Sequence, residues 1–198
     1  DGLITNYFNS KWKKLFPQKK IFFGNLFEEL RYGENPHQKA AIYSINKKLD
    51  INQLNGKPLS YNNYNDIFSA LLISKSLPKN IGTVIVKHSN PCGVSINKNK
   101  VKSYKLALNC DPISAFGGVV SCNFKIKKNL ALEMKKIFLE IIVCNGIEND
   151  ALKILKNKKN LRIIDSSSLN KINLNLISSN INSYLLQTSD NFSFLKSN

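Results

Sequence analysis

The chain has 198 residues, a formal net charge of +16 at pH 7 and 42% hydrophobic residues. This length and composition support one sizeable hydrophobic core and exclude a chain that is disordered throughout. No apolar run reaches the roughly 18 residues of a membrane-spanning helix, and the start of the chain lacks the basic and apolar regions of a secretory signal. We therefore expect no membrane segment. Four cysteines without a Cys-x-x-Cys pair exclude a zinc ribbon and favour a reduced, cytoplasmic setting.

The positive charge is nearly all lysine, spread along the chain, and it raises nucleic acid as a partner. RNA-binding proteins usually add clusters of arginine or aromatic platforms on strands, and neither pattern stands out here. We therefore expect no specific nucleic-acid binding. RNA binding driven by net charge is the weaker alternative, and it predicts an affinity that falls steeply with salt.

The apolar pattern predicts strands and helices that alternate along most of the chain. An amphipathic helix is expected up to Pro17, Asn65 or Asp66 is the expected N-cap of a helix over 67–77, and residues 53–63 and 165–180 are expected loops. The remaining elements are strands at 39–45, 82–87, 119–122, 139–144, 161–165 and 184–187, and helices at 100–109, 127–138 and 148–156. This alternation predicts an α/β fold with three α/β/α layers and a mostly parallel sheet.

Lys87 and His88 directly follow a β-branched run at 83–86 that fits a strand buried on both faces. Pro91 and Gly93 are expected to stop that strand, which leaves the Lys-His pair at its carboxyl edge. Ligands bind at the carboxyl edge in open α/β sheets, and a His beside a Lys suits proton transfer and anion stabilisation near neutral pH. The alternative is that His88 is a loop histidine with a purely structural role.

The chain has only two arginines, Arg31 and Arg162, against a background of lysine. An arginine in such a background indicates a need for the planar, bidentate fork that binds phosphate or carboxylate. Arg31 lies in an unusual run that also holds His37, although it could equally be a surface cation. A further unusual run ends in Gly117 and Gly118, which permit either a close backbone approach or a tight turn.

Four runs together resemble the AICAR formyltransferase/IMP cyclohydrolase family of bifunctional purine-biosynthesis enzymes. They occupy residues 30–38, 59–63, 86–93 and 111–118, in the order of the family, and the resemblance extends over about 25–190. It implies transfer of a formyl group from 10-formyltetrahydrofolate to 5-aminoimidazole-4-carboxamide ribonucleotide in IMP biosynthesis. The implied partners are a nucleotide and a folate, and the implied assembly is a homodimer.

The resemblance also implies roles for individual residues. The acceptor amine is a poor nucleophile, so removal of its proton is the central task, and His88 corresponds to the general base. Lys87 corresponds to the lysine that stabilises the transition state. The positions that correspond to substrate-binding residues are Arg31, Tyr32, Gly117 and Glu140, with Asn90 as an orienting group.

The family's transformylase region has a cytidine-deaminase-like architecture. The deaminase zinc signature is incomplete here, because the Glu expected two residues after His88 is missing and Ser95 replaces the second cysteine, so we expect no zinc. The resemblance further implies that residues 1–24 link to a missing cyclohydrolase domain, that 25–190 form an incomplete first formyltransferase subdomain, and that 191–198 are a polar tail. Such a fragment is expected to be inactive alone. The alternative is a catalytically silent nucleotide-binding or assembly module.

Overall fold

The computed structural model describes residues 2–13, 15–45, 48–169 and 176–188. The chain divides into two compact units, Asp1–Ser168 and Leu169–Asn198. In the second unit, strands β9 (Leu176–Asn180) and β10 (Ser183–Gln187) pair as an antiparallel hairpin. Strand β9 lies within the segment 165–180 that was predicted to be a loop, and that prediction was wrong there. Pairing is made by the backbone, so Ser178, Ser179 and Asn180 can take part in a strand despite their preference for loops.

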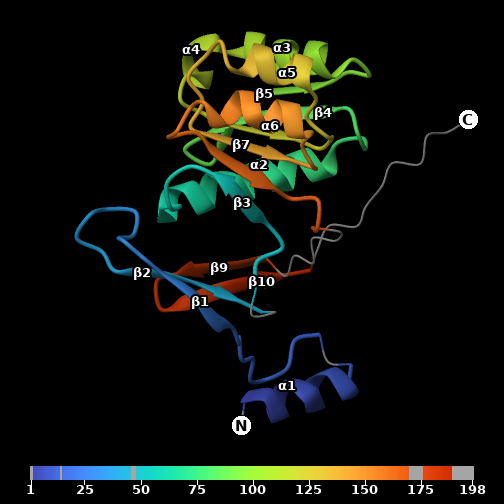
Figure 1. The fold of residues 1–198 in the computed structure, drawn as a ribbon. Coiled ribbons are helices and arrows are strands. Elements are labelled where there is room, and N and C mark those ends of the chain that lie inside the picture. The colour runs from blue at the N-terminus through green and yellow to red at the C-terminus, as the bar shows by residue number, and fades with distance from the viewer. Residues whose placement is uncertain (1, 14, 46–47, 170–175, 189–198) are drawn as a thin grey trace, which may run out of the picture. The chain divides into compact units, whose positions relative to one another are not determined.

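A six-stranded sheet forms the centre of the first unit (Figure 1), in the order β3-β8-β7-β6-β4-β5. Strand β4 is antiparallel to both of its neighbours, β5 and β6. Strands β6, β7 and β8 are parallel to one another, and β3 pairs antiparallel with β8 at the other edge of the sheet. Strands β5 to β8 therefore share one direction, and β3 and β4 run the opposite way. The bounds are β3 (Asn52–Asn55), β4 (Gly82–Lys87), β5 (Asn90–Ile96), β6 (Val119–Cys122), β7 (Ile141–Cys144) and β8 (Arg162–Asp165).

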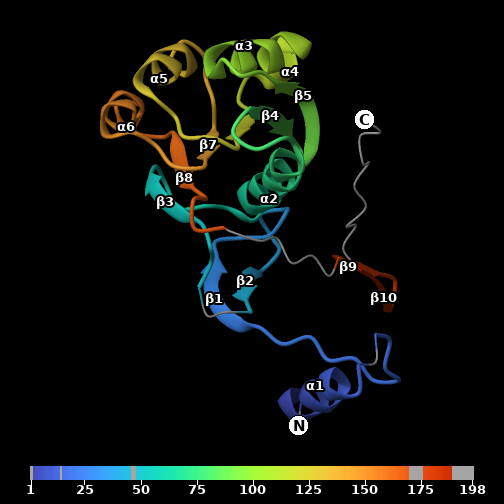
Figure 2. The ribbon, with the colours of Figure 1, turned by 90° about the vertical axis from the view of Figure 1, so that its right-hand side faces the viewer.

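Helices cover both faces of this sheet, which confirms the predicted α/β class and its three layers (Figure 2). Helix α2 (Tyr61–Ser76) packs on one face, and α3 (Lys100–Cys110), α5 (Lys128–Met134) and α6 (Asn149–Lys156) pack on the other. A four-residue helix, α4 (Pro112–Ala115), precedes β6. Ile85, Val120 and Ile142 are fully buried under the three-helix layer, and Val84, Val86 and Ile141, which alternate with them along the strands, are equally buried, so the core lies on both sides of the central strands.

Helix α2 begins earlier than its apolar pattern suggests. Ser60, and neither Asn65 nor Asp66, is the N-cap: its hydroxyl accepts from the Asn63 backbone N at 3.2 Å. The Asn63 side chain returns the bond by accepting from the Ser60 backbone N at 3.1 Å. This capping box starts the helix ahead of its first apolar turn. The cap prediction was therefore wrong, and Asp66 lies inside the helix.

Strand β4 ends at Lys87 as predicted, but Pro91 and Gly93 then lie in a further strand that was not predicted, so the chain stays in the sheet. It reverses at His88 and Ser89 and returns as β5, an edge strand with a bulge opposite Ile85 and Val86. Proline is tolerated in an edge strand because its missing N–H faces away from the ladder. Gly93 is required by packing, since a Cβ at this position would overlap the carbonyl oxygen of Ala107 in α3.

The N-terminal part of the unit contains helix α1 (Gly2–Lys11) and a two-stranded antiparallel sheet of β1 (Asn25–Leu30) and β2 (Ala40–Ser44). Helix α1 ends at Lys11, well before Pro17. Residues 31–39 connect β1 to β2, and the bond from Gly33 N to the Gln38 carbonyl, at 2.8 Å, closes a loop over residues 31–38. No helix within the described part of the chain is both long and apolar enough to cross a membrane.

Candidate functional site

The Lys87–His88 pair lies at the turn of the β4–β5 hairpin. His88 and Ser89 both have positive φ, 51° and 61°, and His88 is exposed. The Lys87 ammonium donates to the Phe116 carbonyl oxygen at 2.9 Å, and the Asn90 side-chain amide donates to the His88 carbonyl oxygen at 2.9 Å. The candidate base thus faces solvent on a turn that is bonded to its neighbours.

The direction of β4 decides which residues meet this turn. Val86 pairs with Val119 and Val119 with Ile141, while Ile141 pairs with Arg162, so the carboxyl end of β4 lies beside the amino ends of β6, β7 and β8. The backbone continues this alignment, with Glu140 N donating to the Gly118 carbonyl at 3.1 Å. The predicted site therefore lies at the carboxyl edge of its own strand but at the amino edge of the four strands that share a direction.

Glu140, a predicted substrate-binding residue, stands at this same edge and is held from two sides. Its Oε1 accepts from the Asn63 side-chain amide of α2 at 2.9 Å and from Arg162 Nη1 of β8 at 3.3 Å. Arg162 also donates to the carbonyl oxygens of Lys57 and Pro58, at 3.2–3.4 Å. The Arg162 guanidinium, for which a planar fork was predicted to be needed, thus binds a carboxylate and the loop before α2.

The backbone is constrained at both residues of the Gly117–Gly118 step. Gly117 has a φ of 72°, and its N–H donates to the Phe138 carbonyl oxygen at 2.9 Å. At Gly118 a Cβ would lie 3.1 Å from the Val86 carbonyl oxygen, so this position allows β4 and the turn before β6 to come close. The step is therefore both a turn and a close backbone approach. It directly follows the Phe116 carbonyl that accepts from Lys87.

Arg31 and Tyr32 follow β1 in the 31–38 loop, where the guanidinium lies 5.8 Å from the centre of the Tyr32 ring. Arg31 also lines a cavity of about 600 Å³ formed by β1 and β2. Within the described residues, no hydrogen bond or ion pair joins Arg31 or Tyr32 to Lys87 or His88. The two parts of the predicted site, the Arg31–Tyr32 loop and the Lys87–His88 turn, are instead connected through α2.

The first two turns of α2 contact every segment that carries a predicted site residue except the Gly117 turn. Asn62 donates to the Glu34 carbonyl at 3.3 Å, Asn63 donates to Glu140, and Asp66 accepts from the Ser89 backbone N at 2.7 Å. Asn62 and Asp66 are four positions apart and share one face of the helix, so the 31–38 loop and the hairpin turn are held at adjacent helical turns. Sequence reasoning missed the roles of Asn63 and Asp66.

Tyr64 adds a fourth connection, from α2 to β1. Its hydroxyl donates to Glu28 Oε2 at 3.3 Å, and burial together with the Glu28 charge raises the pKa of Tyr64 to about 12. The raised pKa means that the phenol stays protonated and remains a donor. Only the run 59–63, noted for its resemblance, and the rarity of arginine gave a sequence signal for these contacts.

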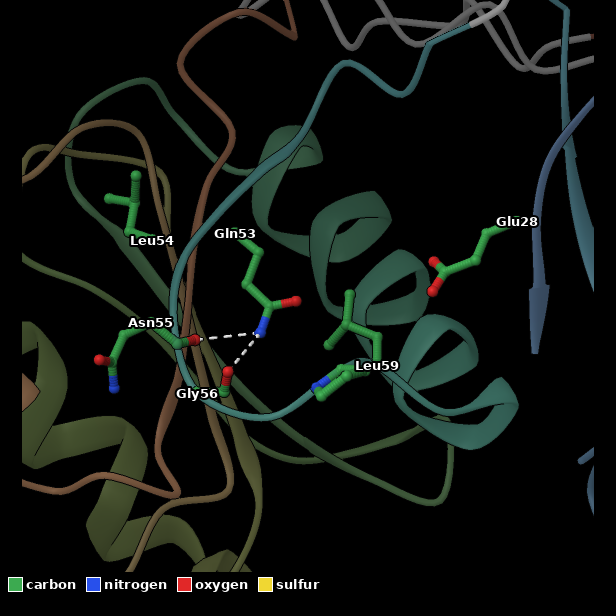
Figure 3. A pocket seen from close by; sticks show the side chains of 7 residues that line it. Glu28, Gln53, Leu54, Asn55, Gly56 and Leu59 are labelled. Atoms are coloured by element: carbon green, nitrogen blue, oxygen red, sulfur yellow. Dashed lines mark hydrogen bonds between the residues drawn. The ribbon is translucent and has the colours of Figure 1, made fainter. Parts of the chain in front are cut away.

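A second cavity, of about 490 Å³, lies between Glu28 and the β3–α2 connection (Figure 3). The Gln53 amide does not face a ligand there, because its nitrogen donates to the carbonyl oxygens of Asn55, Gly56 and Lys57 at 2.8–3.3 Å. The side chain therefore braces the same loop that Arg162 bonds, and both donate to the Lys57 carbonyl oxygen. None of the predicted site residues lines this cavity.

Two cysteines close the central strands as predicted. Cys122 and Cys144 are adjacent in the β6–β7 register and buried, and burial raises the pKa of Cys122 to about 12. They behave as small hydrophobic side chains. Among the described residues, no group of three His, Cys, Asp or Glu side chains could hold a metal ion.

Fold and site together define an α/β domain in which Lys87, His88, Glu140 and Arg162 lie along one edge of a mixed sheet. The chain belongs to the family described as the AICARFT/IMPCHase bienzyme, whose model matches residues 1–198. The resemblance inferred from the four sequence runs is thereby confirmed.

Several curated relatives carry the name bifunctional purine biosynthesis protein PurH. That of Prochlorococcus marinus (strain MIT 9515) is 43% identical over 204 residues, which is 96% of this chain and 39% of the relative. That of Thermoanaerobacter sp. (strain X514) is 44% identical over 168 residues, covering 83% and 33%, and that of Caldicellulosiruptor saccharolyticus is 42% identical over 179 residues, covering 86% and 35%. The chain thus spans about two fifths or less of the length of these relatives.

Proposed function

We propose that this chain carries the first part of a formyltransferase site that acts in purine biosynthesis. The acceptor would be 5-aminoimidazole-4-carboxamide ribonucleotide and the donor 10-formyltetrahydrofolate. The observation that carries the proposal is the hairpin turn, on which His88 is exposed while the Lys87 ammonium lies 2.9 Å from the Phe116 carbonyl oxygen beside Gly117. Membership of the AICARFT/IMPCHase family supports this reaction, as does the role in purine biosynthesis that the names of the relatives state.

His88 would act as the general base. As the substrate amine attacks the formyl carbon, a C–N bond forms, and the amine proton passes to a neutral imidazole nitrogen. The bond from the formyl carbon to the folate nitrogen then breaks, and that nitrogen would leave with the proton that His88 took up, which restores the neutral imidazole. Lys87 would stabilise the negative charge that develops on the formyl oxygen, because its ammonium is already held at this edge.

The nucleotide would be bound by residues from three segments. Arg31 and Tyr32 offer a guanidinium and a phenol for its phosphate or ribose end. Glu140 and Gly117 lie along the edge that leads from the hairpin, and Asn90 would orient the turn through its bond to the His88 carbonyl. We propose that further contacts to nucleotide and folate come from family regions that this chain does not span.

We also propose that the whole protein is a homodimer in the cytoplasm. Cys92, Cys110, Cys122 and Cys144 are all free thiols, as a reducing compartment would keep them. Light scattering of a complete relative that carries this segment would test the dimer.

The decisive experiment grafts this chain into the Prochlorococcus marinus relative in place of its matching segment and measures formyl transfer. His88→Ala should lower kcat by about 10²–10⁴-fold with little change in KM for the ribonucleotide, because a lost base affects the proton transfer more than binding. Lys153→Ala, an exposed change on α6, serves as the control. Full activity of His88→Ala would refute the base assignment. A graft that binds the ribonucleotide but transfers no formyl group would instead identify a silent binding module.

A further inference from the structure

The turn that carries His88 has an unusual composition for its conformation. Two-residue hairpin turns in which both residues have positive φ favour Asn-Gly or Asp-Gly, because other side chains are strained in the left-handed region. Here both positions are left-handed, yet they hold His88 and Ser89. His occurs in this region more often than most residues, whereas Ser does not, so a bond to Ser89 from outside the turn would help to hold the conformation.

Asp66 provides such a bond from another element. Its Oδ1 accepts from the Ser89 backbone N at 2.7 Å and lies 3.5 Å from the Ser89 hydroxyl. A carboxylate acceptor makes a stronger bond than a neutral one. Asp66 is itself fixed, because the adjoining residues of α2, Ile67, Ala70 and Leu71, are buried against the sheet.

Asp66 does not cap helix α2, although acidic residues near the start of a helix often do so. Ser60 and Asn63 form the capping box, and Asp66 lies six positions after the cap. Its carboxylate is turned to the hairpin instead, and Asn90 holds the same turn from the other side through the His88 carbonyl. The two bonds flank the peptide that follows His88.

We propose that Asp66 is a positioning residue that holds the His88–Ser89 turn in its left-handed conformation and thereby fixes where the imidazole of His88 is presented. This inference rests on the proposed function, since the value of a fixed imidazole depends on His88 acting as the base. It assigns to α2 a part in catalysis that does not require contact with the substrate.

The hold on the turn can be measured in the 198-residue chain without any activity. The chain has only two histidines, so ring signals in an NMR spectrum can be assigned with His88→Ala, and His37 provides an internal reference. Asp66→Ala should shift the His88 ring signals and raise the exchange rate of the Ser89 amide about tenfold or more, while the His37 signals stay in place.

Two further variants separate positioning from a general effect on helix stability. Asp66→Asn keeps an oxygen acceptor without the charge and should give an intermediate exchange rate. Asp150→Ala removes an exposed carboxylate from the first turn of α6 and should leave both His88 and Ser89 unchanged. If Asp66→Ala does not fold, Asp66→Asn carries the test. Unchanged Ser89 exchange and unchanged His88 signals in the folded variants would overturn the proposal.

The grafted enzyme then connects the turn to catalysis. Asp66→Ala should lower kcat by about 10–100-fold while KM for the ribonucleotide changes less than about twofold, and Asp66→Asn should restore part of kcat. If His88→Ala abolishes transfer but Asp66→Ala leaves kcat intact, the positioning role fails and the proposed function stands. If Asp66→Ala moves the NMR signals but His88→Ala retains activity, the proposed function fails and the structural hold on the turn remains.

Discussion

The two segments that carry the candidate site are built in different ways. The hairpin with Lys87 and His88 extends the main sheet, and its first strand is buried from Gly82 to Val86 and paired on both sides. The loop with Arg31 and Tyr32 extends a separate two-stranded sheet that is mostly half-exposed or exposed. Its described bonds to α2 are two side-chain contacts of 3.3 Å, from Asn62 to Glu34 and from Tyr64 to Glu28.

The two segments are therefore positioned by different kinds of interaction. The strand that leads to the proposed base is placed by the hydrophobic core, whereas the proposed nucleotide arginine depends on a few polar contacts. Core changes should therefore affect the whole unit, and changes to the polar contacts should act locally. Helix α2 is the element that both halves share.

The largest expected effect comes from breaking the core under the hairpin. Ile142→Ala removes a fully buried side chain from the central strand β7. It should lower the free energy of unfolding by about 2–5 kcal/mol, through lost burial and a cavity. Denaturant unfolding measures this loss, with Leu132→Ala, at a position 47% exposed, as the control. A loss below about 1 kcal/mol would show that this strand is not the support of the hairpin.

Arg31→Lys tests the other half. A point charge cannot replace the planar fork, so binding of the ribonucleotide to the grafted protein should weaken by about 1.5–3 kcal/mol, roughly 10–100-fold. Unfolding of the chain should change little, because Arg31 is exposed. Calorimetry gives the affinity, and an unchanged affinity would remove Arg31 from the proposed site.

Arg162→Lys sharpens the role of α2. The lysine can keep the charge near Glu140 but loses the fork that also bonds the Lys57 and Pro58 carbonyls. We expect a loss of about 1–2 kcal/mol in unfolding free energy and faster amide exchange over residues 57–63. Lys153→Arg, a reverse exchange at an exposed position, is the matched control. Equal exchange in both variants would contradict the bracing role.

Tyr64→Phe has the smallest expected effect, about 0.5–1.5 kcal/mol at neutral pH, because it removes one hydrogen bond. The pKa of Tyr64 is raised from 10.0 to about 12 in the folded chain, chiefly by burial. The contribution of this phenol is present below pH 10 and is lost as the pH rises towards 12, since the unfolded chain ionises first. The stability difference between the two proteins should therefore shrink or reverse between pH 10 and 12. Unfolding at pH 9 and 11 measures it, and a constant difference would refute the burial of this group.

The sequence alone predicted four of the six strands of the sheet, β4, β6, β7 and β8, whereas β3 lies partly in the expected loop 53–63 and β5 was not predicted. A β-branched run at 83–86 and a short apolar run at 119–122 predicted the strands at 82–87 and 119–122 with the bounds that the structure shows, because a strand buried on both faces leaves a local apolar signature. The four unusual runs identified the family, and the rarity of arginine marked Arg162 as a residue in need of a fork.

Only the tertiary structure decided how those elements form a site. The direction of β5 depends on a reversal at His88 and Ser89, so the amino-edge location of the cluster could not be predicted from strand order. The start of α2 depends on a capping box rather than on periodicity. Asn63 meets Glu140 from 77 positions away, and Asp66 meets Ser89 from 23. Apolar periodicity reports the burial of one segment, whereas these contacts arise only when the packed sheet brings separate segments together.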